Sequence, residues 1–271
     1  MKAFRIFLLV AVLGFASALP SSACTSVILS GKYTRSGKAV MFKHRDSSCQ
    51  NVAVEYFQGS RFRLMGVVNA DWRRHPVAQV PKGTPEVWGG MNESGFAIMN
   101  TATYDLKDDD VPASFMDKEG VVMYRALEFC ETLEDFEHFL DTLSRPMGVE
   151  ANFGVIDNYG GAAYYEVNNH SWVKFDVNQA PEGYLVVTNF TQTGRPQDRK
   201  GVDRYEKARK ILASTEVPMM DWNHDFFIRI ISCSGAPILR SSTSCAMVFE
   251  DDTMWAALGK PDRVPCKPYT L

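Results

Sequence analysis

The stretch that decides the fold is residues 24–46, which read CTSVILSGKYTRSGKAVMFKHRD. Residues 24–29 are rich in β-branched side chains and end at a Ser-Gly pair, so they predict a strand. The Ser-Gly-Lys sequence at residues 36–38 predicts a turn, and residues 39–43 predict a second strand. The two strands form a hairpin, which brings the end of the second strand back beside Cys24.

The segment in front of Cys24 has the three parts of a secretory signal. A basic opening is followed by an apolar run over residues 6–16 and by a stretch of small residues up to Ala23. Signal peptidase requires small residues at −3 and −1, and Ser21 and Ala23 meet that requirement for cleavage after Ala23. We therefore predict a signal peptide over residues 1–23, a mature chain that begins at Cys24, and export to the periplasm or the exterior.

An N-terminal Cys24 would carry a nucleophile and a base on one residue. The thiol can attack a carbonyl, and the α-amine, with an ordinary pKa of about 7.7–8.0, can take the thiol proton. Two other outcomes are open from this segment alone. Cys24 could be a lipoprotein cysteine, although Ser21 stands where an aliphatic residue is expected, or cleavage one or two residues away could leave an ordinary thiol.

Composition predicts a single globular domain over residues 24–271. The 271-residue chain is 45% hydrophobic, which is enough for a full core. After the signal, no apolar run approaches the roughly 18 residues of a membrane span, so we expect no stable membrane insertion. Loss of Lys2 and Arg5 with the signal changes the formal net charge from −3 to about −5, which argues against nucleic acid as a partner.

Cysteine and histidine spacing gives no indication of a metal site. The sequence contains no CxxC and no HExxH, and its five histidines lack ligand spacing, so we expect no metal. In an exported chain the six cysteines can form disulfides. Cys233 and Cys245 are one candidate pair, although sequence does not fix the connectivity.

The remaining pattern consists of blocks of strands and blocks of helices. Further strands are expected at 52–57, 62–68, 95–103, 153–156, 162–167, 172–177, 184–188 and 244–249, helices at 123–130, 132–143, 203–213 and 221–232, and a loop-like tail from 259. Hairpins without βαβ alternation predict an α+β fold with antiparallel sheets. Two sheets packed face to face, with helices outside each, would cover every apolar face.

Charged and amide side chains at strand ends are the candidate site residues. Lys43 and Asp46 end the second strand near Cys24, where a cation favours thiolate and a carboxylate can hold the α-amine. Asn100 and Asn189 each follow an apolar strand. Side-chain amides are suitable oxyanion donors in acyl transfer, although an isolated Asn at such a place is more typical of a turn.

Five segments together resemble a known group of enzymes. They are Cys24-Thr-Ser-Val-Ile, Phe42-Lys-His-Arg-Asp46, Met91-Asn-Glu-Ser-Gly-Phe-Ala, Thr188-Asn189 and Asp203-Arg204-Tyr. In this order the chain resembles the N-terminal-nucleophile hydrolases. Within them it is similar to the cysteine branch of linear-amide C–N hydrolases, which includes choloylglycine hydrolases, penicillin V acylases and acyl-CoA:6-aminopenicillanate acyltransferases.

This resemblance implies a fold and a set of roles. The fold would be a four-layer αββα sandwich. Cys24 would be the nucleophile, Asp46 would orient its amine, Asn189 would be an oxyanion or substrate contact, and Arg204 would be the late arginine of the site. Asn100 lies near the place of a second oxyanion asparagine.

Lys43 stands where the bile salt hydrolases have arginine. The positive charge is kept but the planar guanidinium is lost, and the two groups are not interchangeable, so the resemblance does not extend to bile-salt specificity. The expected activity is hydrolysis of a linear amide bond in a small N-acylated molecule, without a metal or organic cofactor. An acyltransferase and a catalytically inactive exported binding protein are the alternatives, and homo-oligomer formation is left open.

Overall fold

Two antiparallel sheets form the centre of the molecule. The computed structural model describes residues 23–106 and 111–271, so residues 1–22 of the expected signal peptide lie outside the described residues. One sheet has the order β10 (Tyr184–Val187), β1 (Ala23–Leu29), β2 (Val40–Asp46), β11 (Thr243–Glu250), β12 (Thr253–Leu258) and β13 (Lys267–Tyr269). The other runs β3 (Val52–Gln58), β4 (Arg63–Asn69), β5 (Gly89–Asn92), β6 (Ala97–Ala102), β7 (Ala151–Ile156), β8 (Ala162–Val167) and β9 (Trp172–Asp176).

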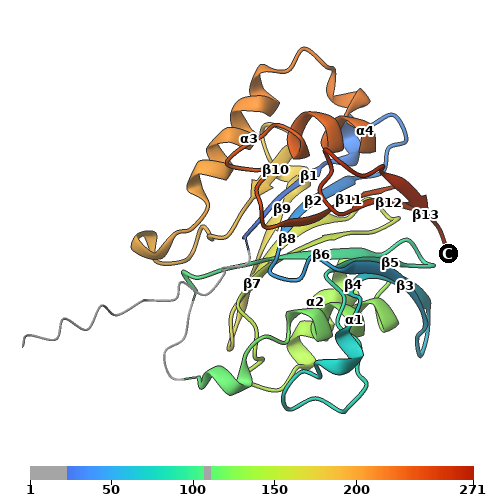
Figure 1. The fold of residues 1–271 in the computed structure, drawn as a ribbon, viewed down its shortest axis with the longest axis vertical. Helices are drawn as coiled ribbons and strands as arrows, with labels where there is room; N and C mark the ends of the chain where they lie inside the picture. The colour runs from blue at the N-terminus through green and yellow to red at the C-terminus, as the bar shows by residue number, and fades with distance from the viewer. Residues whose placement is uncertain (1–22, 107–110) are drawn as a thin grey trace, which may run out of the picture.

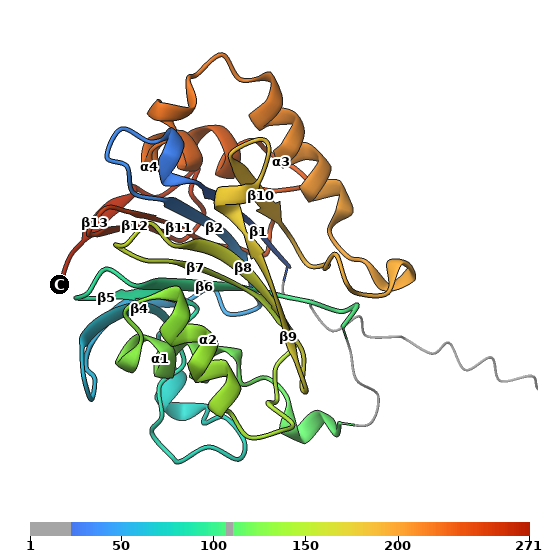
Figure 2. The same cartoon turned by 180° about the vertical axis from the view of Figure 1, so that it is seen from behind.

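Helices cover the outer face of each sheet (Figures 1 and 2). Helices α1 (Glu119–Phe129) and α2 (Leu133–Thr142) lie on the seven-stranded sheet. Helices α3 (Val202–Ser214) and α4 (His224–Phe226), the latter continued by the π-helix η7 (Phe227–Ser232), lie on the six-stranded sheet. Short 3₁₀ helices occur at Gly31–Tyr33, Trp72–Arg74, Ala113–Phe115, Val177–Gln179, Pro196–Asp198 and Met219–Asp221. The predicted α+β sandwich with helices outside both sheets is confirmed.

Three apolar clusters hold these layers together. One lies between the sheets and includes Ile28 and Met41, both fully buried. A second joins the seven-stranded sheet to α1 and α2 around Phe136, whose ring contacts four other aromatic rings. The third joins the six-stranded sheet to α3, α4 and η7 and includes Phe42, stacked on Phe227. Because side chains alternate along a strand, Met41 and Phe42 mark the two faces of β2.

Local side-chain hydrogen bonds set two of the element boundaries. Thr132 and Asp135 form a capping box at the start of α2, with the Thr132 hydroxyl accepting from the Asp135 N–H at 3.1 Å. The buried Asn92 amide donates to the carbonyls of Leu127 and Cys130 at 2.9 and 2.8 Å, which ties the β5–β6 turn to the end of α1. The predicted strand over 95–103 accordingly begins after this turn, at Ala97.

Two expectations for the C-terminal part are wrong. The tail from 259 is not only loop, because residues 267–269 pair with β12 as an edge strand in which Pro268 is tolerated. The candidate Cys233–Cys245 disulfide is absent, and all six cysteines, which lie within the described ranges, are free. Cys245 is buried between the sheets, whereas Cys233 follows η7 on the opposite face of the six-stranded sheet, so the sheet separates the two thiols.

Candidate active site

The β1–β2 hairpin assembles the site around Cys24. Its register places Cys24 opposite Arg45, Ser26 opposite Lys43 and Ala23 opposite Asp46. Cys24 and its partner Arg45 lie on the face of Ile28 and Met41, toward the second sheet. Asp46 lies on the opposite face, toward the helices. The predicted return of Lys43 and Asp46 to the side of Cys24 is therefore seen, but the two charges approach it from different faces of the sheet.

Asn189 and Arg204 hold the backbone of Cys24 on both sides of its Cα. The Cys24 N–H donates to Asn189 Oδ1 at 2.8 Å. The Arg204 guanidinium donates to the Cys24 carbonyl and, at 2.7 Å, to the same Asn189 oxygen. The Asn189 amide nitrogen donates to the Ala102 carbonyl at 2.6 Å, which fixes the orientation of the amide. Cys24 is only 3% exposed and Asn189 is fully buried, so a buried acceptor holds the Cys24 nitrogen.

Arg204 reaches Cys24 because of the turn that precedes α3. Gly201 at the start of the helix has φ = 77°, the left-handed region that favours glycine. A Cβ there would lie 2.0 Å from the Arg204 guanidinium, so only glycine leaves room for it to fold back. Burial lowers the pKa of Arg204, and the nearby Cys24 thiol opposes that shift. The arginine is a fixed cation beneath the Cys24 backbone.

Asp46 belongs to a buried network that neighbouring side chains complete. Its carboxylate accepts from Arg240 Nε at 3.0 Å and from the Thr243 hydroxyl at 2.7 Å. Burial raises the pKa of Asp46, but hydrogen bonds from His44, Arg240 and Thr243 outweigh burial and hold it below its ordinary value. Asp46 is therefore an anion at neutral pH, as a residue that orients an amine must be.

The donors and acceptors of this network determine which nitrogen of His44 carries a proton. The Thr243 hydroxyl gives its single proton to Asp46 and accepts from the Arg240 backbone N–H at 3.0 Å. His44 Nε2 lies 2.9 Å from the same hydroxyl oxygen and must therefore be the donor. Its Nδ1 lies 2.6 Å from the Ser232 hydroxyl. His44 thus links the last residue of η7 to the carboxylate at the site.

Lys43 places a buried ammonium group between the two sheets. Its ammonium donates to Asn100 Oδ1 at 2.8 Å and to the Trp88 carbonyl. Burial is the main cause that lowers its pKa to about 8; Arg45 acts in the same direction, and the thiols of Cys24 and Cys245 oppose it. Lys43 and Asn100 therefore come together between the sheets, and the thiol of Cys24 lies within electrostatic reach of the Lys43 ammonium.

Arg45, whose charge was expected near Cys24 at the end of the same hairpin, stacks over the Trp88 ring at 5.0 Å and donates to Asn69 and Ser244. Tyr104 and Arg240 were not singled out by sequence reasoning. Tyr104 is half-buried beside Cys24, and burial, together with the Cys24 charge, raises its pKa to about 12. No local motif marks this tyrosine. Only the position of residues 103–105 beside the segment that carries Asn189 could have indicated it.

Metal ligation and membrane insertion are the two remaining points for the described residues. No group of three or more His, Cys, Asp or Glu side chains in residues 23–106 and 111–271 could hold a metal ion. Within the same ranges, no helix is long and apolar enough to cross a membrane.

Comparison with known proteins places the chain in a family. Residues 62–220 match the family of acyl-coenzyme A:6-aminopenicillanic acid acyl-transferase. The chain belongs to this family. The matched segment contains Asn100, Asn189 and Arg204 but begins after Cys24 and Asp46. Comparison with curated protein sequences finds no match.

Solved structures of acylases share the fold. The N-acylethanolamine-hydrolyzing acid amidase ortholog of Caenorhabditis elegans superposes with a TM-score of 0.63 at 15% identity, covering 92% of this chain and 100% of that one. A mutant of conjugated bile acid hydrolase from Clostridium perfringens gives 0.52 at 12% identity, with 92% and 97% coverage. Penicillin V acylase from Agrobacterium tumefaciens gives 0.52 at 15%, with 87% and 83% coverage. These likenesses show the N-terminal-nucleophile hydrolase fold.

Proposed function

We propose that this member of the acyl-transferase family is an exported amidase in which Cys24, freed by removal of residues 1–23, cleaves the linear amide bond of a small N-acylated molecule. The proposal rests on the hydrogen bond from the Cys24 nitrogen to Asn189 Oδ1 and on the hydrogen bonds that Arg204 donates to both residues. A side-chain acceptor shared with a buried arginine fixes the position of this nitrogen, as a nitrogen that acts as a base requires. Export is proposed from the basic, apolar and small-residue segments of residues 1–23.

The first half of the reaction forms a thioester. The α-amine of Cys24 takes the thiol proton, and the sulfur attacks the substrate carbonyl carbon. Asn100, whose amide oxygen is bound to Lys43, presents its NH₂ to the developing oxyanion. The oxyanion role expected for Asn189 stays a prediction, because its amide nitrogen is bound to Ala102. The ammonium of Cys24 then protonates the leaving nitrogen as the C–N bond breaks.

The second half returns the enzyme to its starting state. Water attacks the thioester carbonyl while the Cys24 amine takes one of its protons, and the C–S bond breaks to release the carboxylic acid and the thiol. Asp46, an anion held by Arg240 and Thr243, stabilises the positive charge that the amine acquires in each half. Lys43 stabilises the thiolate. No step in this scheme needs a metal or an organic cofactor.

An acyltransferase is the second candidate, and the family match favours it. In that case an acceptor amine replaces water in the second half. The two activities differ only in which nucleophile reaches the thioester. Adding increasing concentrations of glycinamide to the assay decides between them, because a transferase diverts most of the acyl group to the new amide and a hydrolase diverts little.

The test of the proposed function uses acyl amides of 7-amino-4-methylcoumarin, with acyl chains from two to sixteen carbons. The chain 24–271 should release the fluorescent amine with at least one of them, and Cys24→Ala should not. A chain that retains Ala23 is the matched control, because it keeps the thiol but lacks the free amine. Equal activity of the Ala23-retaining chain would refute the N-terminal nucleophile, and equal activity of Cys24→Ala would refute Cys24 altogether.

A further inference from the structure

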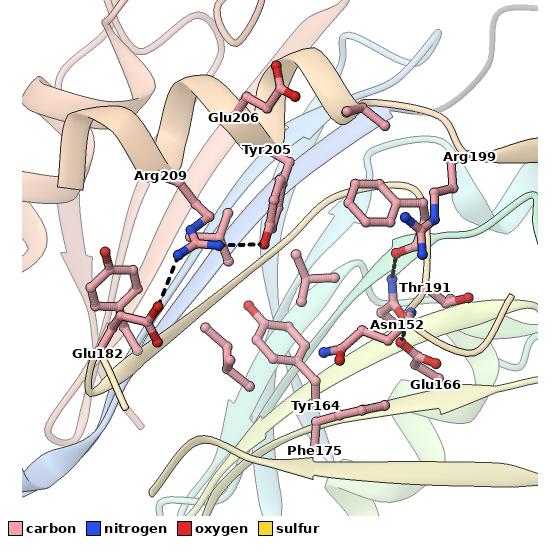
Figure 3. Close-up of a pocket in the computed structure, with 17 residues that line it drawn as sticks. Asn152, Tyr164, Glu166, Phe175, Glu182, Thr191, Arg199, Tyr205, Glu206 and Arg209 are labelled. Carbon is pink, nitrogen blue, oxygen red and sulfur yellow. Dashed lines mark hydrogen bonds and ion pairs between the residues drawn. The ribbon is translucent and has the colours of Figure 1, made fainter. Parts of the chain in front are cut away.

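A groove at one edge of the sandwich lies apart from Cys24. It has a volume of about 580 Å³ and is walled by α3 on one side and by β8 and β9 on the other, with β10 along its length (Figure 3). Its lining includes four consecutive residues of β10, 184–187, and neither Cys24 nor Lys43. The volume lies within the roughly 300–1,000 Å³ typical of ligand pockets, so the groove can hold a short chain of atoms.

The open edge of β10 supplies backbone groups to this groove. β10 is the edge strand of its sheet and pairs with β1 alone. The Ser30 N–H donates to the Gly183 carbonyl in the same register, so the backbone groups of Gly183, Leu185 and Val187 face β1. The N–H and C=O of Tyr184 and Val186 must therefore point the other way.

These outward groups have no partner in the described part of the chain. None of the hydrogen bonds among residues 23–106 and 111–271 involves the outward backbone of Tyr184 or Val186. Tyr184 and Val186 are only 8% exposed, because their side chains belong to the cluster under the helices, while both residues line the groove. Unpaired N–H and C=O groups of an edge strand are a template for pairing with another extended segment. Tyr184 and Val186 thus present two unpaired N–H and C=O sets, spaced as in a strand, to which a further strand can bind.

The side walls indicate what such a strand would carry. Tyr205 of α3 lies across the groove from Tyr164 and Phe175 of the other sheet (Figure 3), and Val202 of α3 also lines it. These walls favour apolar or β-branched side chains. The groove also has charged lining residues. Arg209 is paired with Glu182 at 3.0 Å and with the Tyr205 hydroxyl at 3.1 Å, and Glu166 accepts from the Gln192 and Thr193 N–H groups at 2.5 and 3.1 Å. Arg199, over the Phe190 ring at 5.2 Å, and Glu206 complete the charged lining, in which acids and bases nearly balance.

β10 lies between α3 and β9, and this position limits what can bind to its open edge. In a second copy of the protein β10 would lie equally deep between its own α3 and β9, so two folded edges cannot meet. A single extended segment is narrow enough to enter. Cys24 is not among the lining residues. The carbonyl of Thr188, which follows β10, is already bound by Thr101 and lies 3.4 Å from the Asn152 amide.

We propose that this groove binds a short extended peptide, uncharged and rich in β-branched residues, as an added strand on the open edge of β10. Main-chain hydrogen bonds to Tyr184 and Val186 supply the affinity, as in other cases of strand addition to a sheet edge. The site is independent of the proposed amidase chemistry and can be tested in the Cys24→Ala chain.

The test measures binding of acetyl-Thr-Val-Thr-Val-amide to the mature chain by NMR. The peptide should slow hydrogen exchange at the amides of Tyr184 and Val186 at least tenfold. The same peptide methylated at its four backbone nitrogens keeps the side chains and loses the donors, so it should bind at least tenfold more weakly. Equal binding of the methylated peptide, absence of binding at millimolar concentration, or protection confined to other amides would each overturn the proposal.

Two variants and one matched control place the peptide. Val186→Pro removes an outward N–H without removing a bond to β1, and Val202→Trp fills the groove from α3. Val202 is 38% exposed, and Val217, at 37%, lies outside the groove. Val202→Trp should abolish binding while Val217→Trp leaves it unchanged. Binding by Val202→Trp at wild-type affinity would overturn the proposal even if Val186→Pro does not fold.

Discussion

Conversion of Lys43 to arginine should extend the activity of the mature chain to higher pH. Burial lowers the pKa of Lys43 to about 8, whereas a guanidinium stays charged throughout the accessible range. If the ammonium is needed to hold the Cys24 thiolate and Asn100, activity should fall as Lys43 loses its proton. At pH 9, about one pH unit above that pKa, about one-tenth of the lysines remain charged, so kcat/KM should be about tenfold below its maximum.

The assay is kcat/KM from pH 5 to 10 for the wild type, Lys43→Arg and Lys43→Met, with the best coumarin amide. Lys43→Arg should keep activity at pH 9 within about threefold of its own maximum. Lys43→Met should lose about 10- to 100-fold at pH 7, since a hydrogen bond to a charged group is worth about 1.5–3 kcal/mol. An alkaline limb near pH 8 that persists in Lys43→Arg would show that a group other than Lys43 titrates there, and would exclude this role of the Lys43 ammonium.

The free energy of unfolding should rise with pH over the range in which activity falls. A lysine whose pKa drops from 10.5 to about 8 on folding binds fewer protons in the folded state. Its burial therefore costs about 3 kcal/mol below pH 8, and this cost disappears as pH rises toward 10.5. Urea unfolding of the wild type should show this gain between pH 8 and 10, and Lys43→Met should lack it.

Three further predictions concern the groups around Cys24. Thr243→Val removes the hydroxyl between Asp46 and His44, and should lower the free energy of unfolding by about 1–3 kcal/mol in urea; an unchanged value would mean that the network is not formed. Gly201→Ala should lower kcat/KM at least tenfold, because a Cβ there displaces the Arg204 guanidinium; wild-type kinetics would exclude the contact of Arg204 with Cys24. The pKa of Asp46 is lowered on folding, so its contribution to stability is complete above its ordinary value near 3.8 and is lost as pH falls below that. In Asp46→Asn, the free energy of unfolding in urea should therefore depend less on pH between pH 2 and 4. An unaltered dependence would mean that other groups cause the acid sensitivity.

The sequence predicted those parts of the site that depend on local pairing. Cys24, Lys43 and Asp46 belong to one hairpin, and a turn at residues 36–38 with two β-branched strands is enough to bring them together. Which face of the sheet each side chain occupies follows from alternation, but the sequence alone did not reveal that Lys43 and Asp46 act from opposite faces. That distinction needs the two apolar clusters on the two sides of β2.

The residues that sequence reasoning missed all depend on contacts between distant segments. Arg240 reaches Asp46 across 194 residues, and no turn or periodic pattern connects them. Tyr104 lies beside Cys24 only because residues 103–105 pack against the segment that carries Asn189. The edge strand β13 was missed because it is three residues long and contains Pro268, which disfavours a strand unless its N–H faces an open edge.

Whether Cys24 is the N-terminal nucleophile can be measured by intact and peptide-level mass spectrometry of the exported protein, after brief exposure to a turning-over acyl amide and quenching in acid. Acid keeps the Cys24 amine protonated, so a thioester formed there persists through digestion. We expect an N-terminal peptide that begins at Cys24 and carries one acyl group removable by hydroxylamine. A terminus at another residue, a permanently lipidated Cys24, or an acyl group on any other side chain would exclude Cys24 as the N-terminal nucleophile.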